Sequence, residues 1–501
     1  MRQRYTPGLL ALLFSFLFTL PLYSQSLWQE ESVTNQRQAV GTNRGTLPDK
    51  FRLLRLNTSL LQGSQQAAEA GRGAKGPIMS FPLPDGSQIA AELVESPILV
   101  PSLQARIPDV KTYQLIDPAT GSSLGRITIA GNGITGILFT KDQTVYFNPV
   151  DEENNRLHAV YYTRDVVPPV PLACGVNDEP QHDEATSGAR VNAGDCQLRT
   201  YRLAVAATGE YTAWAGSVSN ALTYITTTVN TVNAIYERDA TIRFNLVDIT
   251  PVIFTDATSD PYTTTTLNSG VLDANNAALN SVYTVNGYDL GIVFHNGWNG
   301  GLAQLNAVCN TGKGRGGAGL SFGFGANPVQ GPQGPAFDGT VAHELAHEFS
   351  ATHSFSATNG SCGSNVSAGT SWEPGGGSTL MAYAGVCTNN SYQQGSDLYF
   401  HVGNVQQIAT YATTGTGNSC AVRTVLQNVA PVVTVAASSY TIPPSTPFVL
   451  TCQTSDANGN NLSYTWEQMD VGTSSAAPSA FSTTGANFRS FPPNSSPTRY
   501  L

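Results

Sequence analysis

The chain has 501 residues, of which 12% are charged, and its formal net charge is −10. A chain of this length is long enough for about three domains, each with its own core. An acidic balance without a basic cluster argues against nucleic acid and anionic membranes as partners.

The first 25 residues have the layout of a signal peptide. Two arginines precede an apolar run over residues 9–22, and small and polar residues follow it. The run is shorter than the roughly 20 residues that a helix needs to cross a bilayer, and no later stretch is long and apolar enough. We therefore expect a secreted, extracellular protein with signal peptide 1–25. A permanent membrane anchor is the alternative, and attachment to the cell surface stays open.

Residues 26–197 are predicted to form a mostly-β unit that ends in a linker. Short β-branched or aromatic runs are separated by turn-forming residues, and Gly131-Asn132-Gly133 is typical of a hairpin. The expected strands lie at residues 94–100, 127–129, 134–139 and 145–147. Three prolines and the polar stretch 177–195 then predict an exposed linker.

The following segment predicts strands and one long helix. Residues 199–205, 242–249 and 290–294 have the composition of strands. The residues that recur at helical spacing are Val218, Leu222, Ile225, Val229, Val232 and Tyr236. Residues 300–305 are either a sheet edge or a glycine-rich turn. The nine glycines from residue 312 to residue 334 predict a mobile loop.

Three of the seven histidines lie within eleven residues. In a helix over residues 337–349, His343 and His347 share one face, so both imidazoles can reach one metal ion. His353 would be the third neutral ligand, which leaves a fourth position for water. Glu344 is suited to take the proton of that water and pass it to a leaving amine. The pattern predicts one catalytic Zn²⁺ with Glu344 as the general base.

The histidine motif resembles the signature of the metzincin zinc peptidases, H-E-x-x-H-x-x-G-x-x-H followed by a Met-turn. Ser350 stands at the glycine position, where a left-handed backbone would cost a serine about 1 kcal/mol. Residues 378–385 resemble the Met-turn, with Met381 as the apolar floor under the imidazoles. Tyr383 stands where some metzincins carry a zinc-proximal tyrosine that can serve an oxyanion. A packed core tyrosine is the alternative.

The closer resemblance is to the reprolysin-like (adamalysin-like) branch, in a secreted bacterial form with a propeptide. It covers residues 198–425 and implies an α/β (α+β) fold and an endopeptidase of proteins or peptides. Ser354 departs from the branch, which usually has aspartate after the third histidine. An inactive adhesion or binding protein and a zinc hydrolase of a non-protein substrate are the alternative functions. The unit 26–197 would be the propeptide, with a plain accessory domain as the alternative.

Seven cysteines suit an exported protein with disulfides, and because the number is odd they cannot all pair with one another. Cys174-Gly175-Val176 resembles the cysteine switch of secreted metzincins, in which a propeptide thiolate takes the fourth position on zinc. A disulfide from Cys174 to Cys196 is the alternative. We expect a Cys362–Cys387 bond, which would brace the segment between third ligand and Met-turn. We also expect Cys309–Cys420 within the catalytic unit.

Residues 428–501 carry short apolar runs among serine, threonine and proline, which predict an immunoglobulin-like or fibronectin-like β-sandwich. The expected strands are residues 431–435, 448–452 and 462–466. The stretch is shorter than the roughly 100 residues of such a sandwich, so we expect a truncated domain. Residues 456–460 could hold Ca²⁺ through their oxygens, with a turn between strands as the alternative. The oligomeric state is unknown from the sequence.

Overall fold

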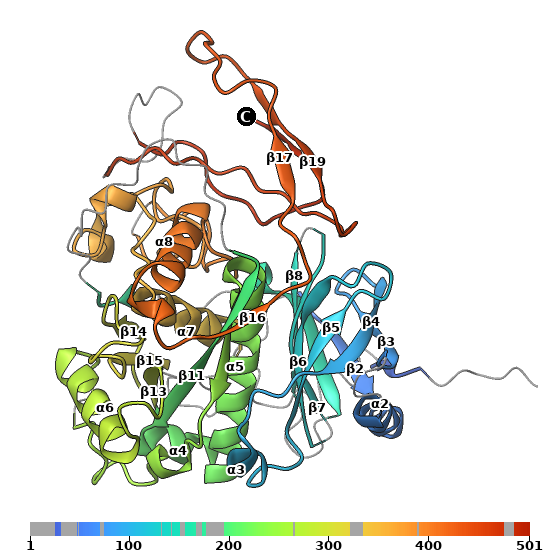
Figure 1. Ribbon diagram of the computed structural model, residues 1–501, viewed down its shortest axis with the longest axis vertical. Helices are drawn as coiled ribbons and strands as arrows, with labels where there is room; N and C mark the ends of the chain where they lie inside the picture. The colour runs from blue at the N-terminus through green and yellow to red at the C-terminus, as the bar shows by residue number, and fades with distance from the viewer. Residues whose placement is uncertain are drawn as a thin grey trace, which may run out of the picture.

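The structure is a computed structural model with three parts in chain order: an antiparallel sheet, an α/β unit and a C-terminal extension (Figure 1). The signal peptide and most of the linker lie outside the described residues. The structure describes residues 26–31, 48, 50–70, 75–131, 133–141, 143–150, 156–166, 173–176, 195–263, 266–320, 334–387, 390–474 and 485–501.

The N-terminal part is a nine-stranded antiparallel sheet in the order β1-β2-β9-β8-β7-β6-β5-β4-β3, so the mostly-β prediction is confirmed. The helices of this part are α2 (Thr58–Ala70) and the short α3 (Pro101–Gln104). Its strands are β1 (Trp28–Glu30), β2 (Arg52–Leu56), β3 (Ile78–Pro82), β4 (Gln88–Glu95), β5 (Lys111–Ile116), β6 (Ser123–Ala130), β7 (Gly133–Phe139), β8 (Thr144–Pro149) and β9 (Leu157–Tyr162).

Alternate residues of these strands serve two different cores, because successive side chains of a strand point to opposite faces. Ile127 and Ile129 of β6 belong to a core on the α2 side of the sheet. Arg126 and Thr128, which alternate with these isoleucines along β6, are buried on the opposite face. Tyr146 of β8 also faces that way and belongs to the core of the α/β unit. The sheet is therefore covered on both faces.

The α/β unit contains a sheet in the order β10-β14-β15-β13-β11-β12, in which β11 also pairs with β16. The central strand β11 is parallel to both β12 and β13. The strands are β10 (Ala173–Cys174), β11 (Gln197–Ala207), β12 (Ile242–Leu246), β13 (Leu290–Asn296), β14 (Gly300–Ala303), β15 (Gly316–Leu320) and β16 (Val422–Val425). Residues 300–303 are thus a strand, as one of the two interpretations expected.

The loop predicted for residues 312–334 is wrong where β15 lies. Its five residues are buried and pair with β13 and β14. A Cβ atom on Gly316 would run into the Glu348 carboxylate, and one on Gly319 would run into Trp298. These glycines therefore permit close packing in a strand, whereas the prediction took them as a sign of mobility.

Five helices surround this sheet: α4 (Gly209–Ala215), α5 (Val218–Ala240), α6 (Ser269–Val282), α7 (Pro335–Glu348) and α8 (Val402–Thr413). The predicted long helix corresponds to α5. Its residues 225–236 are buried without interruption, so every face of that stretch is covered. Figure 1 shows the reason, because α5 lies between the α/β sheet and strands β6 to β8 of the N-terminal sheet.

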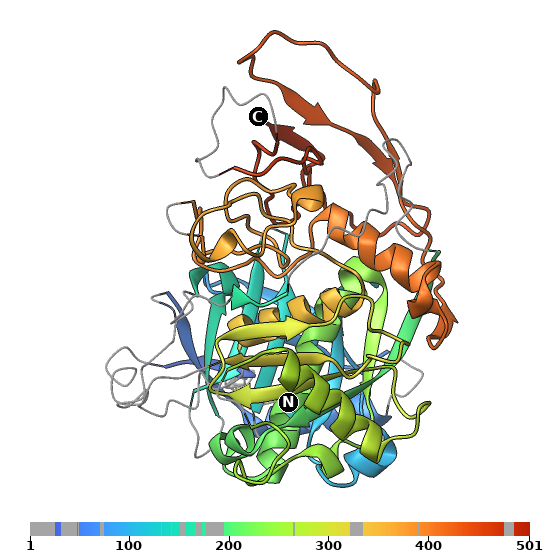
Figure 2. The same ribbon diagram turned by 90° about the vertical axis from the view of Figure 1, so that its left-hand side faces the viewer.

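The C-terminal extension reaches beyond the α8 end of the molecule in Figure 1 and Figure 2. It contains two antiparallel ladders, β17 (Val432–Thr434) with β19 (Gln453–Ser455) and β18 (Val449–Thr451) with β20 (Thr498–Tyr500). The strands expected here are present, but the described residues do not confirm a sandwich, because Val432 and Val433 are more than half exposed. The segment 456–460 is a turn, in which Asp456 accepts backbone N–H groups.

None of the helices in the described part of the chain combines the length and the apolar character that crossing a bilayer requires.

Candidate metal centre

Helix α7 places His343, Glu344 and His347 in the interior, and each is at most 7% exposed. The helix ends at Glu348, and Ser350 then takes a left-handed backbone with φ of 75°. That turn brings the N–H of Ala351 to the carbonyl oxygen of Ala346, at 2.9 Å. The chain thereby reverses and returns His353 to the same site. The left-handed backbone expected at Ser350 is confirmed.

We expect Ser350→Gly to raise the free energy of unfolding by about 0.5–1 kcal/mol, because glycine relieves the left-handed strain but loses more chain entropy on folding. Urea unfolding of the zinc-loaded protein measures this gain. Ser350→Ala is the control, since it keeps the Cβ atom and should leave stability nearly unchanged. A loss of stability in the glycine variant would contradict the strain assigned to this turn.

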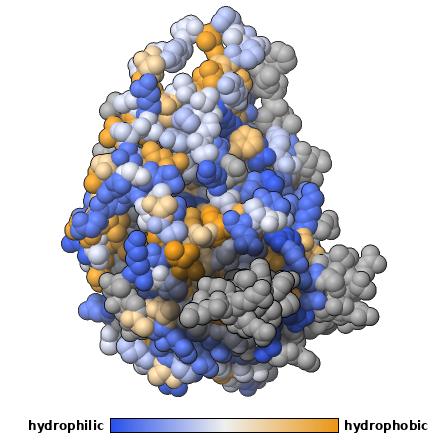
Figure 3. Space-filling view, turned by 90° about the vertical axis from the view of Figure 1, so that its right-hand side faces the viewer, coloured by the Kyte–Doolittle hydropathy of each residue, from blue (hydrophilic) through white to orange (hydrophobic). Residues whose placement is uncertain are grey.

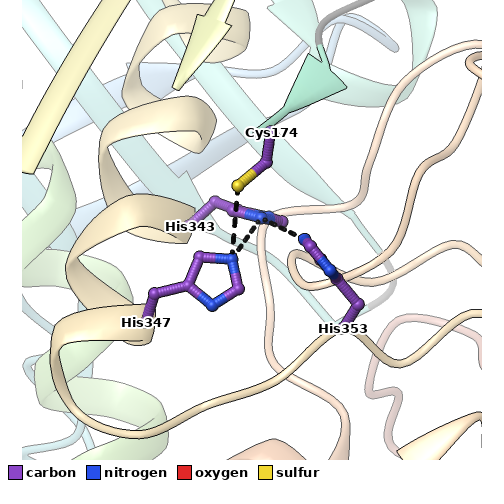
Figure 4. Close-up of side chains that lie close together, drawn as sticks. All are labelled: Cys174, His343, His347 and His353. Carbon is purple, nitrogen blue, oxygen red and sulfur yellow. Dashed lines mark hydrogen bonds between the residues drawn. The ribbon is translucent and has the colours of Figure 1, made fainter. Parts of the chain in front are cut away.

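Three imidazoles and one thiol converge on a common point (Figure 4). Nε2 of His343 lies 3.1 Å from Nε2 of His347 and 3.3 Å from Nε2 of His353. The Cys174 Sγ atom lies 3.4 Å from Nε2 of His347. Ligands at zinc distances in a tetrahedron would be about 3.3 Å apart for two nitrogens and about 3.5 Å for nitrogen and sulfur. The donor set therefore fits zinc in both chemistry and spacing.

Backbone carbonyls orient two of these rings. Nδ1 of His343 donates to the Leu380 carbonyl at 2.6 Å, and Nδ1 of His347 donates to the Ala351 carbonyl at 2.7 Å. Both rings therefore present an Nε2 lone pair to the centre. Burial, with the neighbouring imidazoles, holds the pKa of His343 well below its ordinary value. The ring is neutral, as a metal ligand must be.

The segment expected as the Met-turn lies directly beneath the third histidine. Met381 is fully buried, and its carbonyl oxygen accepts the N–H of Ser354 at 3.1 Å. Because the Leu380 carbonyl orients His343, two successive peptide groups of this turn position two of the three histidine segments. The floor role that the resemblance implies for the Met381 side chain stays a prediction.

Glu373, which the sequence analysis did not single out, joins the third-ligand segment to the Met-turn. Its carboxylate is 1% exposed and accepts the Ser354 hydroxyl at 2.7 Å. It also accepts both the backbone N–H and the hydroxyl group of Ser378 and of Thr379. The aspartate that the branch carries after its third histidine is absent here, and this carboxylate reaches Ser354 from elsewhere. This role of Glu373 is visible only in the tertiary structure.

We expect Glu373→Ala to cost about 3 kcal/mol or more of stability, because buried N–H groups would lose charged acceptors. Zinc affinity should fall about 10- to 100-fold, since the third-ligand segment loses its support. Glu373→Gln should be milder, because one amide oxygen can still accept the backbone N–H groups. Thermal unfolding and competitive zinc titration measure both effects. Glu69→Ala on the surface is the control, and an equal effect of both alanine variants would contradict this role.

Glu344 lies between the imidazoles and the sheet edge. Its side chain is fully buried, and the Cys174 Sγ atom lies 3.5 Å from its Oε2 atom. A Cβ atom on Gly301 of β14 would overlap the Glu344 carboxylate. Glycine at residue 301 therefore lets the acid lie directly against the edge strand.

A second glutamate of α7, Glu348, lies one helical turn beyond Glu344 and is also fully buried. Burial, and secondarily the like charge of Glu344, raises the pKa of Glu348 well above its ordinary value. Burial therefore favours the protonated, neutral form of Glu348. It lies against Gly316 of β15, away from the point where the imidazoles meet.

Strand β10 occupies the edge of the sheet at the metal centre. Its two residues pair in parallel with Gly300 and Gly301, and the Gly175 N–H donates to the Gly301 carbonyl at 2.9 Å. The Tyr383 hydroxyl donates to the backbone carbonyl of Cys174. The Tyr383 ring stacks on Phe355 and is 2% exposed, so it is also a packed residue, as the alternative expected.

A cavity of about 80 Å³ opens beside these residues. His343, Glu344 and Tyr383 line it, together with Thr163 and Val166 from the end of the N-terminal domain. The cavity walls carry small and aliphatic side chains from α7 and the Met-turn segment. An extended peptide paired with β14 would have room for a side chain here.

Two disulfides form in the described part of the chain, Cys309–Cys420 and Cys362–Cys387, and both are the expected pairs. Cys362–Cys387 closes the segment between His353 and the Met-turn. The alternative bond from Cys174 to Cys196 does not form, and the Cys174 thiol lies at the imidazoles instead.

Residues 197–412 match the family model described as metallo-peptidase family M12B, reprolysin-like. The match includes all three histidines, Glu344 and the Met-turn segment. None of the curated proteins compared with the chain matches it. The α/β domain of this chain is therefore similar to the reprolysin-like metallopeptidases of family M12B, a family of zinc-dependent hydrolases.

Proposed function

We propose that this protein is a secreted zinc endopeptidase that hydrolyses peptide bonds of extracellular proteins. The observation that carries the proposal is the convergence of three Nε2 atoms at zinc-ligand spacing, next to a buried glutamate and a sheet edge. The match of residues 197–412 to family M12B and the signal-peptide layout of residues 1–25 support it.

In this proposal His343, His347 and His353 hold the zinc ion. When bound, the ion polarises the scissile carbonyl and lowers the pKa of a water molecule. Glu344 accepts a proton from that water and returns it to the leaving nitrogen. The substrate backbone pairs with β14, where β10 lies in the uncut chain.

Tyr383 is the candidate for stabilising the oxyanion. Its hydroxyl already donates to a peptide carbonyl in the cleft, that of Cys174. A substrate carbonyl at the same place would receive the same hydrogen bond. Donation to the developing negative charge would favour the transition state over the ground state.

We further propose that residues 26–197 keep the enzyme latent through Cys174. The Sγ atom stands where a fourth zinc ligand would stand, and a thiolate is a strong zinc ligand. It would exclude the water on which Glu344 acts. For residues 428–501 we retain an immunoglobulin-like module as a proposal, supported by the two antiparallel ladders.

We expect the processed protein to lose its hydrolysis of casein when a chelator removes its zinc, and to regain it when zinc is added back. The reason is that none of its side chains can replace the Lewis acid. Metal analysis before and after chelation is measured alongside the digestion. Digestion that persists after zinc is removed would contradict the proposal. A zinc-loaded protein that digests nothing would favour a binding function instead.

A further inference from the structure

We propose that the N-terminal domain, residues 26–166, is a permanent subunit of the mature enzyme, and that the inhibitory element is only the segment 173–176. The second half of this inference rests on the proposed function, whereas the first half does not. A conventional propeptide would leave as one piece, so the two cases predict different compositions of the active enzyme.

The first argument is a core that both domains share. Ile137, Tyr146 and Tyr161 of the N-terminal sheet belong to the same buried cluster as Ile225 and Val229 of α5, and none is more than 4% exposed. Departure of the domain would expose these apolar side chains on both partners. Where grey atoms do not cover it, the side of the molecule in Figure 3 carries hydrophilic residues with hydrophobic groups between them. The inner face is therefore built for permanent burial.

The second argument is a buried polar network in which every nitrogen of the Arg126 guanidinium group donates a hydrogen bond. Arg126 of β6 is completely buried against α5. Its Nε donates to Asn230 at 2.7 Å, and its Nη1 donates to Glu237 at 2.9 Å. Its Nη2 donates to the carbonyl and hydroxyl oxygens of Ser96. Every nitrogen of this arginine is satisfied here, and departure of the domain would take the arginine away from its buried partners on α5, which is strongly unfavourable.

The third argument is contact with elements on both sides of α5. The N–H of Leu246, the last residue of β12, donates to the Ile98 carbonyl at 2.7 Å, so the N-terminal domain extends the α/β sheet at its β12 edge. The Tyr146 hydroxyl donates to Asp338 of the metal-binding helix α7 at 2.8 Å. The domain therefore supports the helix that carries two of the histidines, which a disposable propeptide would not need to do.

The segment 173–176 is held by a much smaller set of contacts. β10 pairs with the sheet edge through two residues, Cys174 contacts His347, and the Gly175 N–H donates to the Gly301 carbonyl. Cys174 and Val176 are buried in a small cluster with Phe355 and Tyr383. Residues 167–172 join it to Val166, which lines the same cavity. So short a connection keeps the segment at a high effective concentration in the cleft. One cut in the linker 177–194 would therefore leave the segment in place.

The experiment uses the full chain with sites for two sequence-specific proteases, one within 177–194 and one within 167–172. After the first cut, we expect both fragments to co-elute on gel filtration and peptide hydrolysis to stay near the uncut level. After both cuts, the N-terminal domain should still co-elute, and hydrolysis should rise at least tenfold. Separation of a zinc-loaded α/β fragment from the N-terminal domain in native buffer would overturn the inference.

Variants separate the possible causes of co-elution. Cys174→Ala in the cut protein should still co-elute, because the sheet and not the thiol holds the domain. Arg126→Met should raise the dissociation constant of the fragments at least 100-fold. If that variant does not fold, Tyr146→Phe should raise the constant about tenfold by removing one hydrogen bond. Arg55→Met is the matched control, since its side chain is 47% exposed and should change nothing.

The two proposals fail in different ways. Co-elution after both cuts without any hydrolysis by the zinc-loaded protein would refute the endopeptidase function and keep the subunit. Hydrolysis by an α/β fragment that elutes alone would refute the permanent subunit and keep the endopeptidase. Full hydrolysis after the linker cut alone, with co-elution, would refute 173–176 as the inhibitory element.

Discussion

Glu344→Gln is expected to lower kcat by about 10²- to 10⁴-fold while bound zinc stays at the wild-type level. The amide has the shape of the carboxylate and fits against Gly301, but it cannot accept the proton of a catalytic water. Because the proposed zinc ligands are the three imidazoles, loss of this acid should not release the metal. Hydrolysis of a peptide substrate and metal analysis on the same preparation measure the two quantities. The variant is best made on the protein cut at both sites around 173–176.

Glu348→Gln is the matched control for this prediction. Glu348 lies on the same helix and is buried to the same extent, but its carboxylate lies against Gly316, away from the point where the imidazoles meet. Its raised pKa favours the neutral acid, which an amide resembles. We expect less than a tenfold change in kcat. Equal activity of Glu344→Gln and wild type would end the proposed role of Glu344. Loss of zinc from Glu344→Gln would instead show that this residue is needed for metal binding.

Cys174→Ala is expected to raise hydrolysis by the uncut chain at least about tenfold, because a tethered thiolate competes with water and substrate at millimolar effective concentration. A mercurial reagent should activate the uncut wild type for the same reason, by capping the thiol. Peptide hydrolysis before and after the reagent measures both effects. The reagent should have no effect on the alanine variant.

Cys196→Ala is the control for Cys174→Ala, since Cys196 is also outside the two disulfides but lies at the start of β11. With this substitution, the uncut chain should still show no peptide hydrolysis above the wild-type level. If the Cys174→Ala variant is also inactive, the latency of the uncut chain comes from steric blocking of the cleft by β10, Thr163 and Val166. Retention of the N-terminal domain would not be affected by that outcome.

The motif-based part of the site could be predicted because its spacing is local. His343 and His347 are one helical turn apart, and this separation alone places both imidazoles on one face of α7. The need for a left-handed residue at Ser350 follows from the same short segment. Strands β6, β7 and β8 were also predictable, because alternation of side chains within a strand is a local property.

Tertiary structure alone decided the features that join distant segments. Cys174 could pair with Cys196 or approach the histidines, and only the placement of β10 beside β14 distinguishes the two. Glu373 supports Ser354 from a loop, a contact that no periodicity encodes. Glycines in β15 suggested a loop because composition cannot distinguish flexibility from close packing. The sequence by itself thus determined the chemistry of the zinc motif through short-range geometry. Long-range packing determined how that chemistry is supported and covered.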